Sequence, residues 1–365
     1  MREPSSSSTS SSRARPPEGG TRERGGWRAA VGFAALVAAA LACVATAWLA
    51  LNLARRDERI ANGAALHACD FLAFKQALAA HTAPDARGRV LFVGLSNVLM
   101  SVRADEIGAA LERPAINFGL IANLSTGMVF EAAARAARPG DLVVLSLPHW
   151  SYQRATTLDV QQQVVKDLVF SCPTQGFWRL PLRYELTFLA RQDMAQVVEA
   201  YARKAVRAVA GPQAWPAPPV AWHLATNADG GTFSSAGDWT GNRRADRRAD
   251  RFARIAEAPL RLADLRVDER DESVRELRRF VREARARGVD VVAVWPAAYV
   301  GDAPRGDVLG AIRALYADMD VALLGEPEEF FYALDDFYDS PNHLTHEAAS
   351  VYSARLAELL APVAP

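Results

Sequence analysis

The chain is poor in lysine, cysteine and histidine, and it carries no net charge. Of its 365 residues, three are lysines, three are cysteines and six are histidines. The basic side chains are almost all arginines and equal the acidic ones in number, so the composition does not indicate a nucleic-acid partner. No Cys-x-x-Cys pair and no Cys/His cluster occurs, which removes the usual signal for zinc. We expect neither a metal ion nor nucleic acid as a ligand.

Two nucleotide-binding motifs are also missing. No Gly-x-Gly-x-x-Gly follows the first expected strand, and no Gly-Lys-Ser or Gly-Lys-Thr occurs anywhere. The first motif lets a backbone approach a pyrophosphate, and the second cradles phosphates at a helix N-terminus. We therefore expect no dinucleotide, no bound nucleoside triphosphate and no other cofactor.

The N-terminal region divides into two parts. Residues 1–26 are rich in Ser, Gly, Pro and Arg and nearly lack apolar side chains, so they predict a disordered tail. Residues 29–51 carry no charge, and at about 1.5 Å per residue a helix of that length crosses a bilayer. The sequence thus predicts a single transmembrane helix followed by a folded domain over residues 56–365.

Charges on either side of this segment predict its orientation. Six arginines against three glutamates precede it, whereas residues 55–59 are nearly balanced. By the positive-inside rule we expect a cytoplasmic tail, an inner-membrane anchor and an extracytoplasmic, periplasmic domain. The alternative is a cleaved signal peptide, because residues 45–47 are small enough for a cleavage site, although the apolar run continues past them.

The cysteines are consistent with this placement. Cys43 lies inside the apolar segment, which leaves Cys69 and Cys172 as the pair on the outer side. A disulfide would persist there. Two cysteines can also lie apart unpaired, so the sequence leaves both states open.

Alternating helical and apolar segments predict an α/β fold. The continuous apolar runs are typical of parallel strands buried on both faces, and the helical stretches between them would cover the sheet. We expect a three-layer α/β/α, flavodoxin-like domain with an insertion at about residues 150–250. The strands are expected at 90–93, 114–118, 141–147, 289–294 and 321–324, and the helices at 61–80, 124–138, 158–170, 192–209, 271–287, 307–318 and 345–360.

Two segments carry residues that could perform chemistry. Ser96 follows the first strand at a Gly-Leu-Ser turn, where the carboxyl edge of the sheet begins. Asp339 and His343 lie four residues apart just before the last helix, for which Thr345 is the expected N-cap. A serine needs an adjacent base, and that base is usually oriented by a third group. The set predicts a hydrolase or acyl-transferase site.

At these residues the chain resembles the SGNH/GDSL hydrolase superfamily over about residues 88–360. The resemblance is to its membrane-anchored bacterial envelope branch, which includes proteins of teichoic-acid D-alanylation and of polysaccharide O-acetylation. It implies a nucleophilic Ser96, a catalytic Asp339 and His343, and an oxyanion site at Gly119 beside Asn117. Two features depart from the family pattern. Gly-Leu-Ser replaces Gly-Asp-Ser, and the third segment, where the family places an asparagine after a strand, reads Ser146-Leu147-Pro148-His149-Trp150.

That missing asparagine removes one expected oxyanion donor, a loss that typically costs about 100- to 1000-fold in rate. Asn97 and His149 are the polar residues that could replace it. Each of these residues also has a structural interpretation. Ser96 could be an ordinary turn serine, His343 a residue whose hydrogen bond fixes Asp339 at the helix start, and His149 a packing residue.

Two segments of the insertion stand out. Residues 237–242, Gly-Asp-Trp-Thr-Gly-Asn, set a Gly-flanked carboxylate beside an aromatic ring, which suits a carbohydrate or polar ligand or an ordinary loop. Residues 243–251 repeat Arg and Asp and predict a solvated helix face with i,i+4 pairs.

Two functions follow from these residues. The first is a membrane-anchored serine esterase or O-acyltransferase acting on an envelope glycan or another ester. The second is a catalytically inactive SGNH-fold scaffold of an acylation or export complex, which the missing asparagine favours. Both imply a membrane, and a membrane-bound acyltransferase or polysaccharide export component as partner.

Overall fold

The computed structural model describes residues 22–57, 63–121, 126–152, 194–211, 214, 233–257 and 265–364. The chain divides into two compact units, residues 1–52 and residues 53–365. The predicted helix at 158–170 lies outside the described residues, as do most of the predicted tail and much of the predicted insertion.

Helix α1 (Arg22–Asp57) contains the predicted transmembrane segment. Its residues Gly26–Ala47 have a mean hydropathy of 2.3, and none of them is buried within the structure. A core helix of a soluble protein would be covered, whereas Phe33 and Leu36 are each 71% exposed. At about 1.5 Å per residue this stretch is long enough, and apolar enough, to span a membrane.

The second unit is built on a five-stranded parallel sheet in the order β2-β1-β3-β4-β6. Its central strands are apolar and buried on both faces, as the continuous apolar runs predicted. This order belongs to doubly wound α/β folds, whose ligands bind beyond the carboxyl ends of the strands. The strands are β1 (Val90–Gly94), β2 (Ala115–Gly119), β3 (Leu142–Ser146), β4 (Asp290–Val294) and β6 (Leu323–Leu324).

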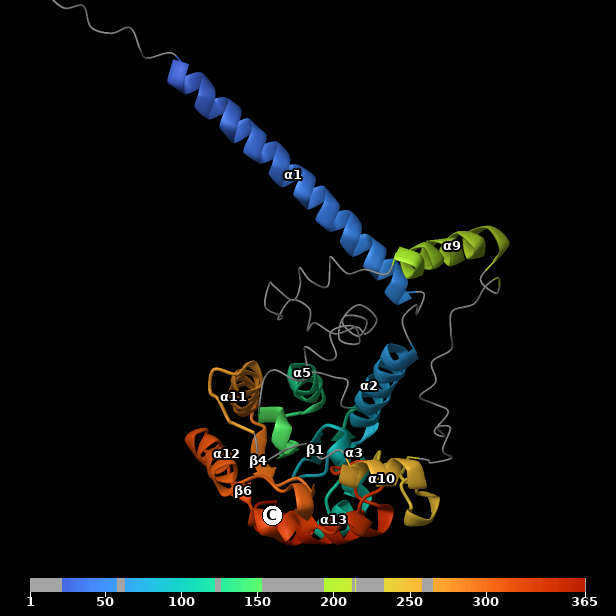
Figure 1. Cartoon of the computed structure of the whole chain (residues 1–365), viewed down its shortest axis with the longest axis vertical. Coiled ribbons are helices and arrows are strands. Elements are labelled where there is room, and N and C mark those ends of the chain that lie inside the picture. The colour runs from blue at the N-terminus through green and yellow to red at the C-terminus, as the bar shows by residue number, and fades with distance from the viewer. Residues whose placement is uncertain are drawn as a thin grey trace, which may run out of the picture. The chain divides into compact units, whose positions relative to one another are not determined.

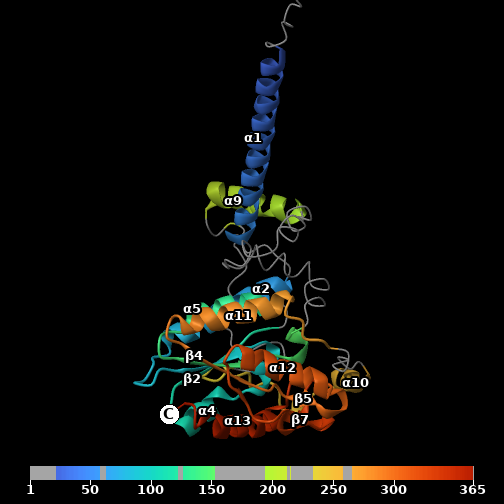
Figure 2. The same ribbon diagram turned by 90° about the vertical axis from the view of Figure 1, so that its left-hand side faces the viewer.

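Helices cover both faces of this sheet, so the α/β prediction is confirmed (Figures 1 and 2). One layer contains α2 (Gly63–His81), α5 (Thr126–Ala136) and α11 (Glu272–Arg285). The other contains α3 (Ser96–Ser101), α4 (Ala104–Leu111) and α13 (His346–Leu360). Helix α12 (Gly306–Asp318) precedes β6 and contacts it, and α9 (Met194–Ala210) and α10 (Ala249–Glu257) belong to the insertion.

A small second sheet escaped the sequence analysis. It pairs β5 (Ala298–Tyr299) with β7 (Phe331–Tyr332) in parallel. Each strand is only two residues long, and such short runs have no detectable alternation.

Candidate active site

The turn before α13 is closed by its own backbone. Phe337 and Leu344 form an antiparallel bridge, and the Tyr338 amide donates to the His343 carbonyl at 2.8 Å. The Thr345 hydroxyl accepts a hydrogen bond from the Ala348 amide, as expected of an N-cap. This cap fixes the position at which the turn ends and the helix begins.

Asp339 and His343 form a close pair on this turn. The distance from His343 Nδ1 to Asp339 Oδ1 is 2.6 Å, and both side chains are about one-fifth exposed. A carboxylate can only accept, so Nδ1 carries the hydrogen, and in the neutral form of the ring this tautomer has its lone pair on Nε2. His343 Nε2 has no hydrogen-bond partner among the described residues. The imidazole is therefore oriented as a general base would be.

Arg251 is a third member of this cluster that the sequence analysis missed. Its guanidinium lies 3.8 Å from Asp339 Oδ2, whereas His343 contacts Oδ1. Burial raises the pKa of Asp339, but the hydrogen bond and charge of His343 and the charge of Arg251 outweigh it and lower that pKa. Asp339 is thus held as an anion beside the imidazole.

The predicted i,i+4 pairing of residues 243–251 does not describe these arginines. Arg244 pairs with Asp336 and Arg247 with Asp335, at 3.0 and 3.4 Å, so the repeat binds the segment that precedes the His343 turn. Helix α10 begins only at Ala249, because residues 244–246 form a short 3-10 turn instead. The one sign of this pairing in the sequence is the two successive acidic residues at positions 335 and 336.

Ser96 is the first residue of α3, directly after the end of β1. Its side chain is half-buried, and its hydroxyl has no hydrogen-bond partner among the described residues. At the other end of α3, the Ser101 hydroxyl accepts from the Leu344 amide at 3.0 Å and donates to the Asn342 carbonyl. Ser101 thereby ties α3 to the turn on both sides of His343.

The length of α3 sets the separation between these groups. Five residues of helix rise about 7.5 Å, so Ser96 lies about that far along α3 from the anchored Ser101. No hydrogen bond joins Ser96 to His343 in the described part of the chain. The catalytic roles of Ser96, Asp339 and His343 remain predictions.

Asn97 and Asn117 hold α3 in place. Asn97 accepts from the Leu95 amide and donates to the Ser146 carbonyl at 2.9 Å, joining the ends of β1 and β3. Asn117 is fully buried and donates to carbonyls of α3 and its C-cap, with distances of 3.0 Å to Val98 and Val102. Both amides have structural partners.

Gly119 is required by the close approach of α3. A Cβ at this position would lie 2.2 Å from the Leu99 amide nitrogen, closer than real Cβ contacts. The Gly119 amide donates to Asn117 Oδ1 at 2.9 Å. It can serve as the predicted oxyanion donor only if that bond opens.

His149 lies just beyond β3 and is 2% exposed. Neither ring nitrogen has a hydrogen-bond partner in the described structure, and the ring lies against Trp295, with 6.3 Å between centroids. Burial lowers the pKa of His149 to about 3, so the ring is neutral at physiological pH. A neutral imidazole still has one N–H donor to offer.

Residues 237–242 hold the ends of α3 and α4 and the His343 turn together. Asp238 is fully buried, and its carboxylate accepts from the amides of Ala104 and Asp105 and from the Ser234 hydroxyl. It therefore caps α4. Asn242 donates to the carbonyls of Met100 and Leu344, so this segment joins the end of α3 to the His343 turn.

Lys75, one of three lysines, is buried beside residues 237–242. Its ammonium donates to the carbonyls of Asn117 and Gly237 and lies over the ring of Phe71 at 5.3 Å. Burial lowers the pKa of Lys75 to about 7, against the opposing charge of Asp238. Burying a charged ammonium group costs free energy unless its N–H groups are hydrogen-bonded.

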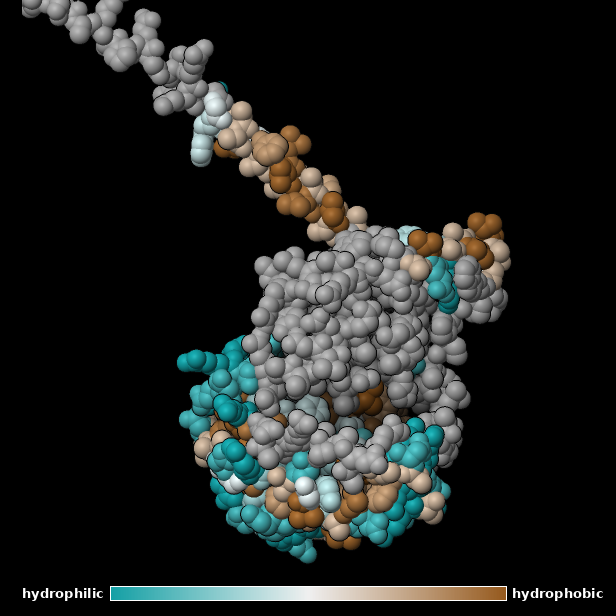
Figure 3. All heavy atoms as spheres, in the orientation of Figure 1, coloured by the Kyte–Doolittle hydropathy of each residue, from teal (hydrophilic) through white to brown (hydrophobic). Residues whose placement is uncertain are grey.

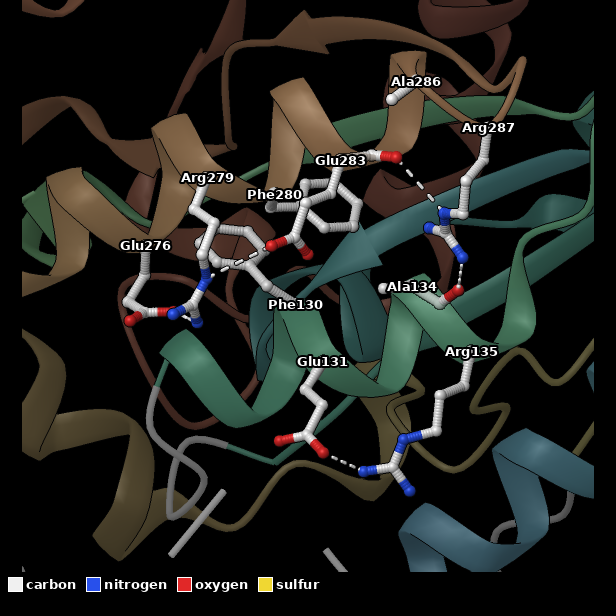
Figure 4. Close-up of a pocket in the computed structure, with 10 residues that line it drawn as sticks. All are labelled: Phe130, Glu131, Ala134, Arg135, Glu276, Arg279, Phe280, Glu283, Ala286 and Arg287. Carbon is white, nitrogen blue, oxygen red and sulfur yellow. Dashed lines mark hydrogen bonds and ion pairs between the residues drawn. The ribbon is translucent and has the colours of Figure 1, made fainter. Parts of the chain in front are cut away.

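A separate groove of about 670 Å³ lies between α5 and α11 (Figure 4). Its floor is the stacked pair Phe130 and Phe280, with centroids 5.0 Å apart. Charged side chains pair along its rim, including Glu131 with Arg135 and Glu276 with Arg279. None of the predicted site residues lines it.

Over the described residues, no group of three or more His, Cys, Asp or Glu side chains could hold a metal ion. The predicted Cys69–Cys172 pair lies outside the described residues, because Cys172 and the side chain of Cys69 are not among them. Comparisons with protein-family models and with curated proteins found no match to this chain.

Proposed function

We propose that this chain is a membrane-anchored serine esterase or O-acyltransferase of the SGNH type, acting on an envelope glycan or another ester. The observation that carries the proposal is the 2.6 Å pair of His343 and Asp339, on a turn that Ser101 ties to the helix beginning at Ser96. In this proposal α1 anchors the chain in the inner membrane, and the α/β domain works outside the cytoplasm.

In the proposed reaction His343 acts first as a base and then as an acid. His343 Nε2 takes the proton from Ser96 as its oxygen attacks the acyl carbonyl, and Asp339 stabilises the imidazolium that forms. The tetrahedral oxyanion is met by the Ser96 amide, which has no acceptor among the described residues. His343 then protonates the departing alcohol, leaving an acyl-serine. Water hydrolyses this ester, or a sugar hydroxyl takes the acyl group.

A reactive-site probe tests this proposal. Full-length protein in detergent is treated with a fluorophosphonate, which phosphonylates an activated serine. We expect labelling that disappears in Ser96→Ala and His343→Ala. Ser350→Ala removes a hydroxyl from the surface of α13 and serves as the matched control, because that serine binds Glu106 away from the turn. Equal labelling of Ser96→Ala and the parent protein would contradict the proposal.

The second candidate is a non-catalytic scaffold with the same fold. The engaged Gly119 amide and the absence of a third-segment asparagine favour it, because both reduce the donors available to an oxyanion. It predicts no labelling of any serine in the folded protein. Under this alternative, His343 and Asp339 serve only to stabilise the turn.

A further inference from the structure

Helix α9 (Met194–Ala210) has apolar and charged side chains on opposite sides. At 100° per residue, Val198, Tyr201 and Val209 fall on one side. Arg203 and Arg207 fall on the other, with Glu199 and Lys204 at its borders. The helix has three basic residues and one acidic residue, so it is amphipathic and positively charged.

The exposure of these two sides is the reverse of what a globular protein shows. Val209 is 90% exposed, Val198 63% and Tyr201 43%. Arg203 is only 6% exposed and pairs with Glu199 at 2.7 Å. In Figure 3 the brown apolar spheres of α9 are openly visible and separate from its teal polar spheres. An amphipathic helix that belongs to a soluble surface turns its apolar stripe inward.

We propose that α9 lies flat on the membrane that α1 spans, with its Val198, Tyr201 and Val209 side in the interface between headgroups and acyl chains. Such helices combine a large apolar side with basic residues that attract anionic lipids, and tyrosine is favoured at headgroup level. This inference rests on the membrane anchorage in the proposed function. A bilayer accounts for the outward apolar side chains and the positive charge together.

The chain permits this placement. Tyr152 and Met194 are 42 positions apart in the sequence, and that number of residues sets a maximum span of about 3.3–3.6 Å per residue between the last described residue after β3 and the start of α9. A protein partner could cover the same valines, and the experiment must distinguish lipid from protein.

Photocrosslinking in the full-length chain makes that distinction. Benzoylphenylalanine is introduced at position 209 or 198, with position 199 as the control on the charged side and position 36 as the control within α1. Each protein is reconstituted into vesicles of phosphatidylethanolamine and phosphatidylglycerol and irradiated. Mass spectrometry then identifies the adducts. The native cysteines stay in place. Leu36, Val198 and Val209 are exposed, so these substitutions preserve folding, and the unfolding midpoint of the protein substituted at half-buried Glu199 is compared with that of the parent.

We expect lipid adducts at positions 209, 198 and 36, and none at position 199. Adducts to peptides of this chain or of a second copy at 209 and 198, with lipid still attached at 36, would overturn the placement of α9 alone. The same holds if 209 and 198 form no lipid adduct while 36 does. If position 36 also fails to reach lipid, the anchor itself is refuted, and α9 loses its membrane with it.

Discussion

Two pairs of polar residues, Asp238 with Asn242 and Ser96 with His343, differ in how completely their side chains are hydrogen-bonded. Asp238 and Asn242 are fully buried, and every oxygen and amide nitrogen of their side chains has a partner. Ser96 and His343 are partly exposed, and the Ser96 hydroxyl and His343 Nε2 have no partner among the described residues. Polar groups whose hydrogen bonds are satisfied stabilise a fold, whereas groups without a partner are available for chemistry.

The largest expected effect is on catalysis. Ser96→Ala and His343→Ala should each reduce the hydrolysis of p-nitrophenyl acetate by about 10⁴-fold or more, because in the proposed mechanism the nucleophile and the base act as one unit. The double variant should be no slower than either single one. Steady-state kinetics of the three proteins check this. If the losses multiply instead, the two residues do not share a reaction step.

Asp339→Asn should have a smaller effect. The asparagine side chain has no negative charge to stabilise an imidazolium, and its NH2 group cannot accept the hydrogen of His343 Nδ1. The kcat should therefore fall by about 10²- to 10⁴-fold. The midpoint of thermal unfolding should change little, because asparagine has the shape of aspartate and its Oδ1 can still accept from His343 Nδ1. A variant with full activity would show that Asp339 only shapes the turn.

For Asp238→Ala we expect the opposite pattern, which is a loss of folding stability. Removing the carboxylate leaves the amides of Ala104 and Asp105 at the start of α4 without their acceptor. Lost charged hydrogen bonds and a lost cap predict a decrease of about 2 to 4 kcal/mol in the free energy of unfolding. Denaturant titration measures it, with Asp307→Ala as a control at an exposed carboxylate. A ligand-binding role for Asp238 would instead leave stability unchanged.

The last expected effect is a dependence of stability on pH that comes from Lys75. Its pKa is about 7 in the folded state and about 10.4 when unfolded. Between these values the unfolded chain binds the proton that the folded chain has released. The free energy of unfolding should therefore rise with pH by up to about 1.4 kcal/mol per unit. Lys75→Met should lose this rise between pH 7 and 9, and parallel pH curves for the two proteins would contradict the assignment.

The sheet and its helices were predictable because they depend on local patterns. Apolar runs such as 141–147 bury both faces of a strand, and β3 is found at Leu142–Ser146. The Asp339 and His343 pair was also predictable, because both residues lie on one short turn. Neither inference needed contacts between distant segments.

The remaining features depend on contacts that the sequence does not specify. Ser101 was overlooked because its partners, Asn342 and Leu344, lie more than 240 residues away. Asp238 has the local pattern of a ligand-binding loop, and only the start of α4 packed against it identifies it as a cap. The same reason explains the arginines of 243–251, whose acidic partners come from a distant turn.

The most direct test of the central claim is to locate the acyl group. The protein is incubated with p-nitrophenyl acetate, quenched in acid within the first turnover and digested for peptide mass mapping. We predict one acetyl group, on Ser96, in the parent protein and none in His343→Ala. An acetyl group on another residue, or equal acetylation of Ser96 in both proteins, would contradict the claim that His343 activates Ser96.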